Sequence, residues 1–176
     1  LIETATNRLM IGCNNTIIPD DVTSISDYAF YGCNAFESII IPSGVTTIGQ
    51  NAFEECISLE SIELPESVRS IGVAAFYNCS ALKSIEIPGS VKSIGDAAFS
   101  HCENLVDISN VKIPSSVVNM YSAFEYCINL ERIVLPEGLE TIGYYAFLNC
   151  TGITDVTIGS KLTSIGYSAF YNWSSL

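Results

Sequence analysis

The chain has 176 residues, of which 48% are apolar, 10% are aromatic and only 15% are charged, and its formal net charge is −12. This acidity excludes a nucleic-acid-binding protein, which needs a basic face against phosphate, and it excludes docking on anionic lipid headgroups. No segment approaches the roughly 18 consecutive apolar residues of a spanning helix, so we expect no membrane insertion in this chain.

An Ala-Phe pair recurs along the chain and divides it into repeats. Five of the six steps between the phenylalanines of these pairs are 23 residues, and the step from Phe99 to Phe124 is 25. A period of this length is typical of a solenoid, in which each repeat stacks on its neighbours. The phenylalanines are Phe30, Phe53, Phe76, Phe99, Phe124, Phe147 and Phe170. We therefore predict a single domain, residues 1–176, of about seven 23-residue repeats.

Residues 1–18 precede the first complete repeat and are predicted to form a hairpin that caps it. Leu9 and Ile11 would lie on its first strand and Ile17 and Ile18 on its second, with an Asn-Asn turn between them. Such a hairpin would cover the open edge of the first coil.

Each repeat then begins with a predicted strand. In the repeat that runs from Ser58 to Cys79, Leu59, Ile62 and Leu64 end in strict alternation, which is typical of a strand with one buried face. Pro65 follows and ends the strand, because proline has no N–H group to donate to a sheet.

The rest of the repeat is predicted to return along other sides of the coil. Val68 and Ile71 form a short extended piece, and Gly72 then supplies a turn with positive φ. The apolar residues around Phe76 and Cys79 are three apart, which favours one helical or 3₁₀ turn. Identical columns would stack about 4.8 Å apart, so the strands form one parallel sheet and the phenylalanines form a buried spine.

Residues 103–121 are predicted to form an irregular junction. Eleven residues, rather than eight, separate the cysteine of this repeat from Pro114, and the short extended piece ends at Met120 with no glycine after it. We interpret the insertion as a tolerated loop, and a protruding ligand contact is the alternative. At the other end Trp173 replaces the cysteine, and we expect the array to be truncated at residue 176.

Cysteine and histidine are the first candidates for chemistry. Six of the seven cysteines share one repeat column, which we interpret as free, buried thiols, although their spacing alone does not exclude disulfides. No C-x-x-C pair is present, which disfavours structural zinc. His101 is the only histidine, and its column varies between repeats, which indicates a surface position rather than a general base. The chain is therefore predicted not to be an enzyme and to use no cofactor, metal or catalytic residue.

The combined pattern L-x-x-I-x-I-P-x-x-V-x-x-I-G-x-x-A-F-x-x-C resembles the leucine-rich repeats of the BspA-like, or treponemal, class over about residues 16–176. The resemblance implies an α/β, β-rich fold: a right-handed leucine-rich-repeat solenoid with one parallel β-sheet on the concave side and short extended or 3₁₀ turns on the other sides. It also implies a bacterial protein that is extracellular or at the cell surface, with its signal peptide and anchor outside this chain.

The same resemblance implies a non-enzymatic protein-binding module. Family members are associated with adhesion, so the expected partner is a protein of a host, such as the extracellular matrix, or of a neighbouring cell, bound by a monomer. The alternative is a structural spacer or assembly repeat that presents another domain.

Two surfaces are candidates for partner binding. The first is the outward face of the predicted strands, whose charge changes from acidic to mixed along the chain. Its candidate residues are Ile40, Glu63, Glu86, Lys112, Arg132, Val134, Asp155 and Thr157. The alternative for this face is a merely solvated surface.

The second candidate surface is a tyrosine patch near the C-terminal repeats, because half-exposed tyrosines are enriched at interfaces. It comprises Tyr144, Tyr145, Tyr167 and Tyr171. Packing of these rings over the phenylalanine spine is the alternative.

Overall fold

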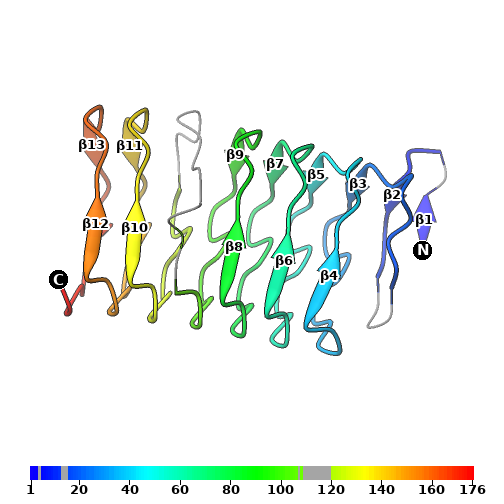
Figure 1. Cartoon of the computed structure of the whole chain (residues 1–176), viewed down its shortest axis with the longest axis horizontal. Helices are drawn as coiled ribbons and strands as arrows, with labels where there is room; N and C mark the ends of the chain where they lie inside the picture. The colour runs from blue at the N-terminus through cyan, green and yellow to red at the C-terminus, as the bar shows by residue number, and fades with distance from the viewer. Residues whose placement is uncertain (4, 13–15, 107, 109–119) are drawn as a thin grey trace.

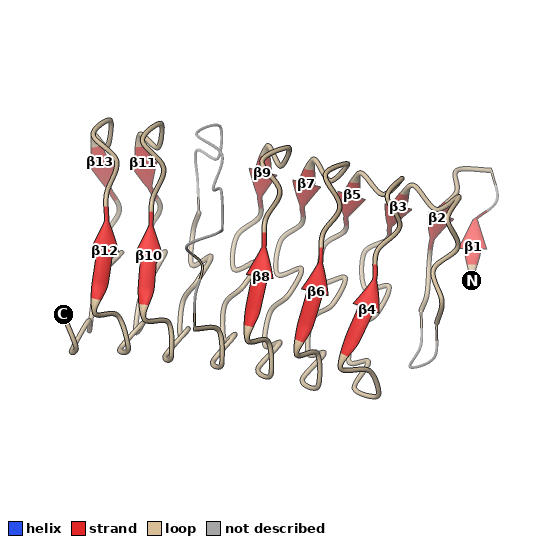
Figure 2. Ribbon diagram, viewed as in Figure 1, coloured by secondary structure: helices blue, strands red, loops and turns tan. Residues whose placement is uncertain are grey.

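The computed structural model describes residues 1–176 except residues 4, 13–15, 107 and 109–119. The chain winds into a solenoid whose coils stack side by side along the long axis, with the two termini at opposite ends (Figure 1). The described residues form strands and turns and contain no helix (Figure 2). This architecture confirms the predicted solenoid of parallel strands.

Three-residue strands form two parallel sheets, β4-β6-β8 and β10-β12, and we call the two together the long-strand ladder. Its strands are β4 (Ser38–Ile40), β6 (Ser61–Glu63), β8 (Ser84–Glu86), β10 (Arg132–Val134) and β12 (Asp155–Thr157). Strand β6 pairs with β4 and β8, and β10 pairs with β12, always with a shift of 23 residues. The middle residue of β6 and of β8 is buried and its two neighbours are exposed, as the alternation predicts.

Two-residue strands follow another side of the coils, and their parallel pairs fall into two sheets, one from β2 to β9 and one of β11 and β13, which we together call the short-strand ladder. Its strands are β2 (Arg8–Leu9), β3 (Ser24–Ile25), β5 (Thr47–Ile48), β7 (Ser70–Ile71), β9 (Ser93–Ile94), β11 (Thr141–Ile142) and β13 (Ser164–Ile165). The sequence predicts only an extended piece here, whereas Ile25, Ile48 and Ile71 lie opposite one another in paired strands. The register that aligns the long strands also aligns the backbone donors and acceptors of these segments, so the fold has parallel pairing on two sides.

The N-terminal hairpin lies earlier in the chain than the predicted one. Strand β1 (Ile2–Glu3) pairs antiparallel with β2, with Ile2 opposite Leu9, and β2 in turn pairs with β3. The predicted Asn-Asn turn at residues 14–15 lies outside the described residues, and residues 16–18 carry no strand. The hairpin therefore extends the short-strand ladder.

The phenylalanine segment forms turns rather than the predicted helical or 3₁₀ turn. Its N–H groups alternate between two directions: Phe53 donates to Ala75 of the next coil (2.7 Å), and Cys56 donates back to Phe53 (3.2 Å). A helix would direct all of these N–H groups along its own axis, so none would reach the neighbouring coil. The residues two before each spine phenylalanine have positive φ: Tyr28, Asn51, Ala74, Ala97, Ser122, Tyr145 and Ser168. The residues two after it do so as well: Gly32, Glu55, Asn78, His101, Tyr126, Asn149 and Asn172.

Glycine is required after the short strand for a different physical reason from the positive φ that the sequence predicts. Among the described glycines, only Gly32 has a positive φ (65°). At Gly72 a Cβ atom would lie 2.5 Å from the carbonyl carbon of Gly49 in the preceding coil, and at Gly95 it would lie 2.3 Å from the nitrogen of Val73. Glycine is therefore required there because the backbones of neighbouring coils approach too closely for a side chain.

The phenylalanines form the predicted spine. Successive rings from Phe30 to Phe147 stack with centroids 4.9–5.4 Å apart, and the last step, to Phe170, is 6.1 Å. This spacing is close to the strand separation of a sheet, about 4.8 Å, so ring stacking and backbone pairing are satisfied together.

The spine also crosses the 25-residue step without a break. The rings of Phe99 and Phe124 lie 5.3 Å apart with 12° between their planes. The N–H of Ala123 donates to Met120, as the N–H of Ala75 donates to Gly72. Met120 therefore occupies the glycine column, not the preceding column to which the sequence assigns it. Of the predicted junction, residues 107 and 109–119 lie outside the described part of the chain.

We predict that Gly72→Ala destabilises the protein by about 3 kcal/mol, since the new Cβ forces two backbones apart. Gly32→Ala is the matched control, because its Cβ meets no atom within 4 Å and only the positive φ is strained. The control should cost about 1 kcal/mol. Urea denaturation of both variants measures the difference, and equal losses would contradict the close-approach explanation.

Candidate functional site

The N-terminal part of the long-strand ladder presents an apolar and acidic row of exposed side chains. Ile40, Glu63 and Glu86 end three consecutive strands and are register partners. The two carboxylates are thus one strand spacing apart, about 4.8 Å between backbones, where like charges repel. Neither belongs to an ion pair among the described residues. Their field is therefore available to a cationic partner.

The C-terminal part of the same ladder carries opposite charges that neutralise each other. Arg132 Nε lies 2.9 Å from Asp155 Oδ2, and both side chains are about half exposed, so the pair contributes little stability. Val134 and Thr157 are register partners beside them, Val134 being half-buried and Thr157 exposed. Lys112, predicted for the same row, lies outside the described residues.

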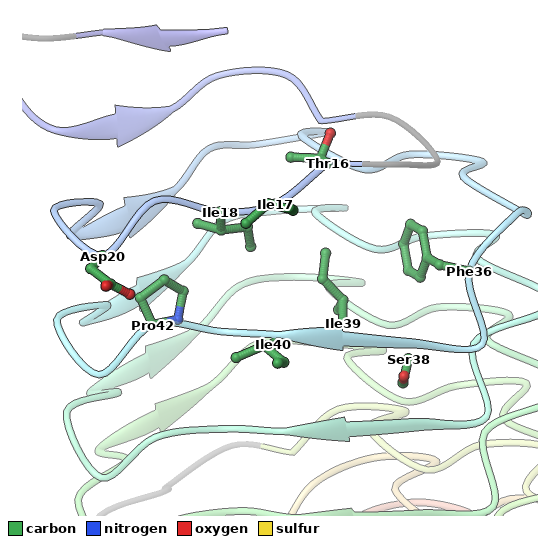
Figure 3. A pocket seen from close by; sticks show the side chains of 9 residues that line it. All are labelled: Thr16, Ile17, Ile18, Asp20, Phe36, Ser38, Ile39, Ile40 and Pro42. Carbon is green, nitrogen blue, oxygen red and sulfur yellow. The ribbon is translucent and has the colours of Figure 1, made fainter.

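An apolar groove opens at the first strand of the ladder, between residues 16–18 and β4 (Figure 3). Its volume is about 510 Å³, and Phe36 and Ile39 line it together with two strongly exposed isoleucines, Ile17 (89% exposed) and Ile40 (86% exposed). A smaller hollow of about 260 Å³ lies on the other side of β4 and reaches Glu63.

Sequence reasoning finds Ile40 but misses the groove. Ile17 lies 23 residues before Ile40 and therefore occupies the same outward column. Ile17 is instead predicted to lie in a capping hairpin. The repeat register carries the signal for its outward position, because it aligns Ile17 with Ile40.

The four predicted tyrosines are exposed but do not form one continuous ring cluster. Tyr145 and Tyr167 meet edge to face, with centroids 5.9 Å apart, whereas Tyr144 stacks on Tyr121 at 5.5 Å. Tyr171 has 65% of its surface exposed, and Tyr167 has 70%. The rings thus pack partly on one another and leave apolar area in solvent. A partner-binding role for this patch stays a prediction.

His101 lies in an aromatic column on the turn side. Its ring stacks on Tyr126 with centroids 4.6 Å apart and lies 5.3 Å from Tyr77. The side chain is only partly exposed. The position is one of the left-handed turn residues, and its ring lies between tyrosine rings of the two neighbouring coils.

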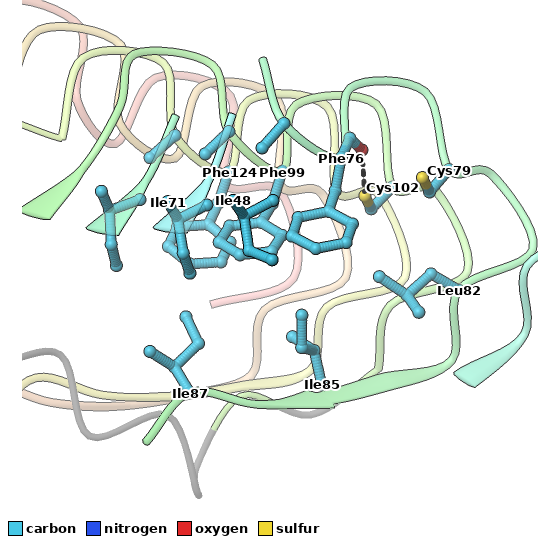
Figure 4. Close-up of a cluster of buried hydrophobic side chains, with 14 of the residues drawn as sticks. Ile48, Ile71, Phe76, Cys79, Leu82, Ile85, Ile87, Phe99, Cys102 and Phe124 are labelled. Carbon is cyan, nitrogen blue, oxygen red and sulfur yellow. Dashed lines mark hydrogen bonds between the residues drawn. The ribbon is translucent and has the colours of Figure 1, made fainter. Parts of the chain in front are cut away.

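The cysteine column supplies hydrogen-bond donors to the spine. The thiol of each described buried cysteine donates to the carbonyl of the phenylalanine one coil earlier, as Cys102 does to Phe76 at 3.3 Å (Figure 4). At the C-terminal end the indole Nε1 of Trp173 donates to Phe147 at 2.9 Å, in the position where earlier repeats use a thiol. The other donor cysteines are Cys56, Cys79, Cys127 and Cys150.

These thiols are core groups. The five buried cysteines, Cys56, Cys79, Cys102, Cys127 and Cys150, form no disulfide. Burial raises the pKa of the thiols, for Cys56, Cys102 and Cys150 to about 12, so that they stay protonated and unreactive at neutral pH. The predicted free thiol ladder is confirmed for these residues, and Cys13 lies outside the described part.

Within the described ranges, no group of three or more His, Cys, Asp or Glu side chains could hold a metal ion. No helix long and apolar enough to cross a membrane occurs in those ranges either.

Comparison with known proteins identifies related sequences and structures. A family model for the BspA type leucine rich repeat region matches residues 9–122 and 119–176, with six copies. The Treponema pallidum leucine rich repeat protein is 33% identical with a TM-score of 0.79, over 88% of this chain and 72% of that chain. A Bacteroides ovatus leucine-rich repeat protein is 37% identical with a TM-score of 0.77, over 85% of this chain and 38% of the other.

A leucine rich cell surface protein of Faecalibacterium prausnitzii is also similar, with 33% identity and a TM-score of 0.64 over 90% of this chain and 51% of that chain. The chain thus spans about two fifths to about seven tenths of the length of these relatives. No curated protein matches the chain.

The buried thiols predict a specific loss of stability at alkaline pH. Below pH 9 both states keep the thiol proton, whereas above it the unfolded thiol ionises and the folded one does not until about pH 12. The free energy of unfolding should therefore fall as pH rises between these values, by up to about 1.4 kcal/mol per pH unit for each thiol. Urea denaturation under reducing conditions at pH 8, 9, 10 and 11 measures this slope.

Cys102→Ala should reduce the fall of the free energy of unfolding with pH by the contribution of one thiol. The same substitution lowers stability at neutral pH, because the hydrogen bond of the thiol is lost. Comparison of slopes removes the contributions of tyrosine and lysine titration, which both proteins share. Parallel slopes for the two proteins would show that Cys102 does not keep its proton in the fold.

Proposed function

This chain belongs to the BspA-type leucine-rich repeat family, and we propose that it is a non-enzymatic protein-binding module of a cell-surface or secreted protein. Its partner is a protein, and the long-strand ladder carries the binding face. The family and its fold are protein-interaction scaffolds, which is the premise of this proposal.

One observation carries the choice of face. The inward residue in the middle of each long strand is isoleucine or valine. The outward residues at the ends of the same strands are register partners of one another and differ from coil to coil: Ile40, Glu63 and Glu86, then Val134 and Thr157. These outward side chains make no contribution to the spine, so they vary without cost to the fold. A rigid ladder with a variable outer row is suited to recognition.

The size of the solenoid supports a single protein partner. Seven coils at about 4.8 Å span roughly 34 Å. A face of that length provides an area near the ~800 Å² that each partner buries in an ordinary protein interface. We propose that a monomer binds one partner in this way.

The location of the protein and the class of its ligand are further parts of this proposal. The similar Faecalibacterium protein is described as a leucine rich cell surface protein, which supports a surface location. We propose adhesion to, or recognition of, a protein of a host or neighbouring cell, with extracellular-matrix proteins as the first class to test. The exposed, unpaired carboxylates Glu63 and Glu86 favour a partner surface that is basic.

We predict that Glu63→Lys/Glu86→Lys weakens binding to a purified extracellular-matrix protein at least tenfold, because it replaces attraction by repulsion. The measurement is surface plasmon resonance against an array of such proteins. Asp96→Lys is the control, since Asp96 is exposed on the turn side.

Binding that survives the double substitution and is lost in a Tyr167→Ser/Tyr171→Ser variant would move the site to the tyrosine patch. Failure of the unmodified protein to bind any protein on the array would favour the spacer alternative.

A further inference from the structure

The groove lies along the edge of β4, and this edge has no strand partner among the described strands. Among the described strands, β4 pairs only with β6 and ends the ladder order β4-β6-β8. The segment one repeat earlier, residues 16–18, runs alongside but forms no strand. The long-strand ladder is therefore open at this side.

The direction of the free backbone groups follows from the register. In β6 the N–H of Ser61 donates to Glu37 of the preceding coil at 3.2 Å. Backbone groups alternate in direction along a strand, so the equivalent groups of β4, those of Ser38 and Ile40, point towards the groove. An edge of this kind is a template for another extended chain.

The groove walls add apolar pockets to this edge. Ile17 and Ile18 stand on one wall, and Ile39 and Ile40 stand on the other (Figure 3). The volume of about 510 Å³ is within the range of sites that bind ligands in proteins. Ile17 and Ile40 occupy the same outward column and are almost fully exposed, so they give the groove an apolar rim that a partner can cover.

Charge indicates the composition of that partner. Asp20 lines the groove near the C-terminal end of β4, and Glu63 lines the adjoining hollow beside Ile40. Both carboxylates are exposed, so a cationic side chain that passes this end of the groove meets Asp20, and Glu63 adds to the negative field from across β4.

We propose that the edge of β4 binds an extended segment of a partner protein by strand addition, with apolar side chains at alternate positions and a lysine or arginine near Asp20. The main chain of the segment pairs with Ser38 and Ile40, and its apolar side chains fill the space between Ile17 and Ile40. This inference rests on the proposed protein-binding function and names the part of the face, and the type of segment, that it uses.

The test uses a library of eight-residue peptides with alternating apolar and variable positions and a lysine at either end. Fluorescence anisotropy selects the tightest binder, which is then made again with N-methyl groups on the amides that face β4. We expect the first peptide to bind and the methylated one to bind at least tenfold more weakly. Hydrogen exchange at the amides of Ser38 and Ile40 should slow when the first peptide is added.

Ile17→Ser/Ile40→Ser should also weaken peptide binding at least tenfold, and both positions are so exposed that the fold should tolerate the change. Ile57→Ser is the matched control, because Ile57 is a half-exposed isoleucine outside the groove. Absence of any binding peptide at about millimolar concentration would overturn the inference. Equal binding of the methylated peptide, or amides already protected in the free protein, would do so as well.

Two further outcomes separate this inference from its premise. If Ile17→Ser/Ile40→Ser leaves matrix-protein binding intact while Glu63→Lys/Glu86→Lys abolishes it, the proposed function stands and strand addition is wrong. If sedimentation shows self-association that Ile17→Ser/Ile40→Ser abolishes, a second copy of the chain occupies the groove, which also overturns the inference.

Discussion

The spacing between neighbouring coils is the constraint on which the rest of the structure depends. Backbone hydrogen bonds hold successive coils at about the strand separation of a sheet, and every group between them must fit that distance. Stacked phenylalanine rings meet it, with centroids 4.9 Å apart for Phe30 and Phe53. Glycine meets it where backbones touch, because a Cβ at Gly72 would lie 2.5 Å from the preceding coil. The residues that repeat in every coil are thus those whose size and shape fit this distance.

The cysteine column follows from the same constraint. The spine carbonyls from Phe30 to Phe124 each accept a bond from their own coil, such as Cys79 N–H to Phe76 at 3.2 Å, and the thiol of the next coil gives each a second donor. A thiol is small and apolar enough for the space and still donates a weak hydrogen bond. Trp173 shows that the donor is the shared property, because its indole reaches the equivalent carbonyl with a different shape.

The sequence predicts the periodic features of this fold and misses those that depend on neighbouring coils. The strand alternation around Ile62 and the spine at Phe76 are readable, because burial imposes a period on each coil. The positive φ expected at Gly72 falls instead on Ala74, since side-chain identity alone does not distinguish a tight turn from a close backbone approach. The strand alternation predicts the outward candidates. The groove at Ile17 is not predictable in this way, because it depends on residues 16–18 forming no strand beside β4.

We propose that the outward row of the long-strand ladder, and not the tyrosine patch, binds protein. Hydroxyl-radical footprinting tests it directly, on the protein alone and in complex with the extracellular-matrix protein that it binds most tightly. We expect reduced oxidation of Ile40 in the complex and unchanged oxidation of Tyr167 and Tyr171, all three of which are exposed in the free protein. Reduced oxidation of Tyr167 and Tyr171 with Ile40 unchanged would contradict it.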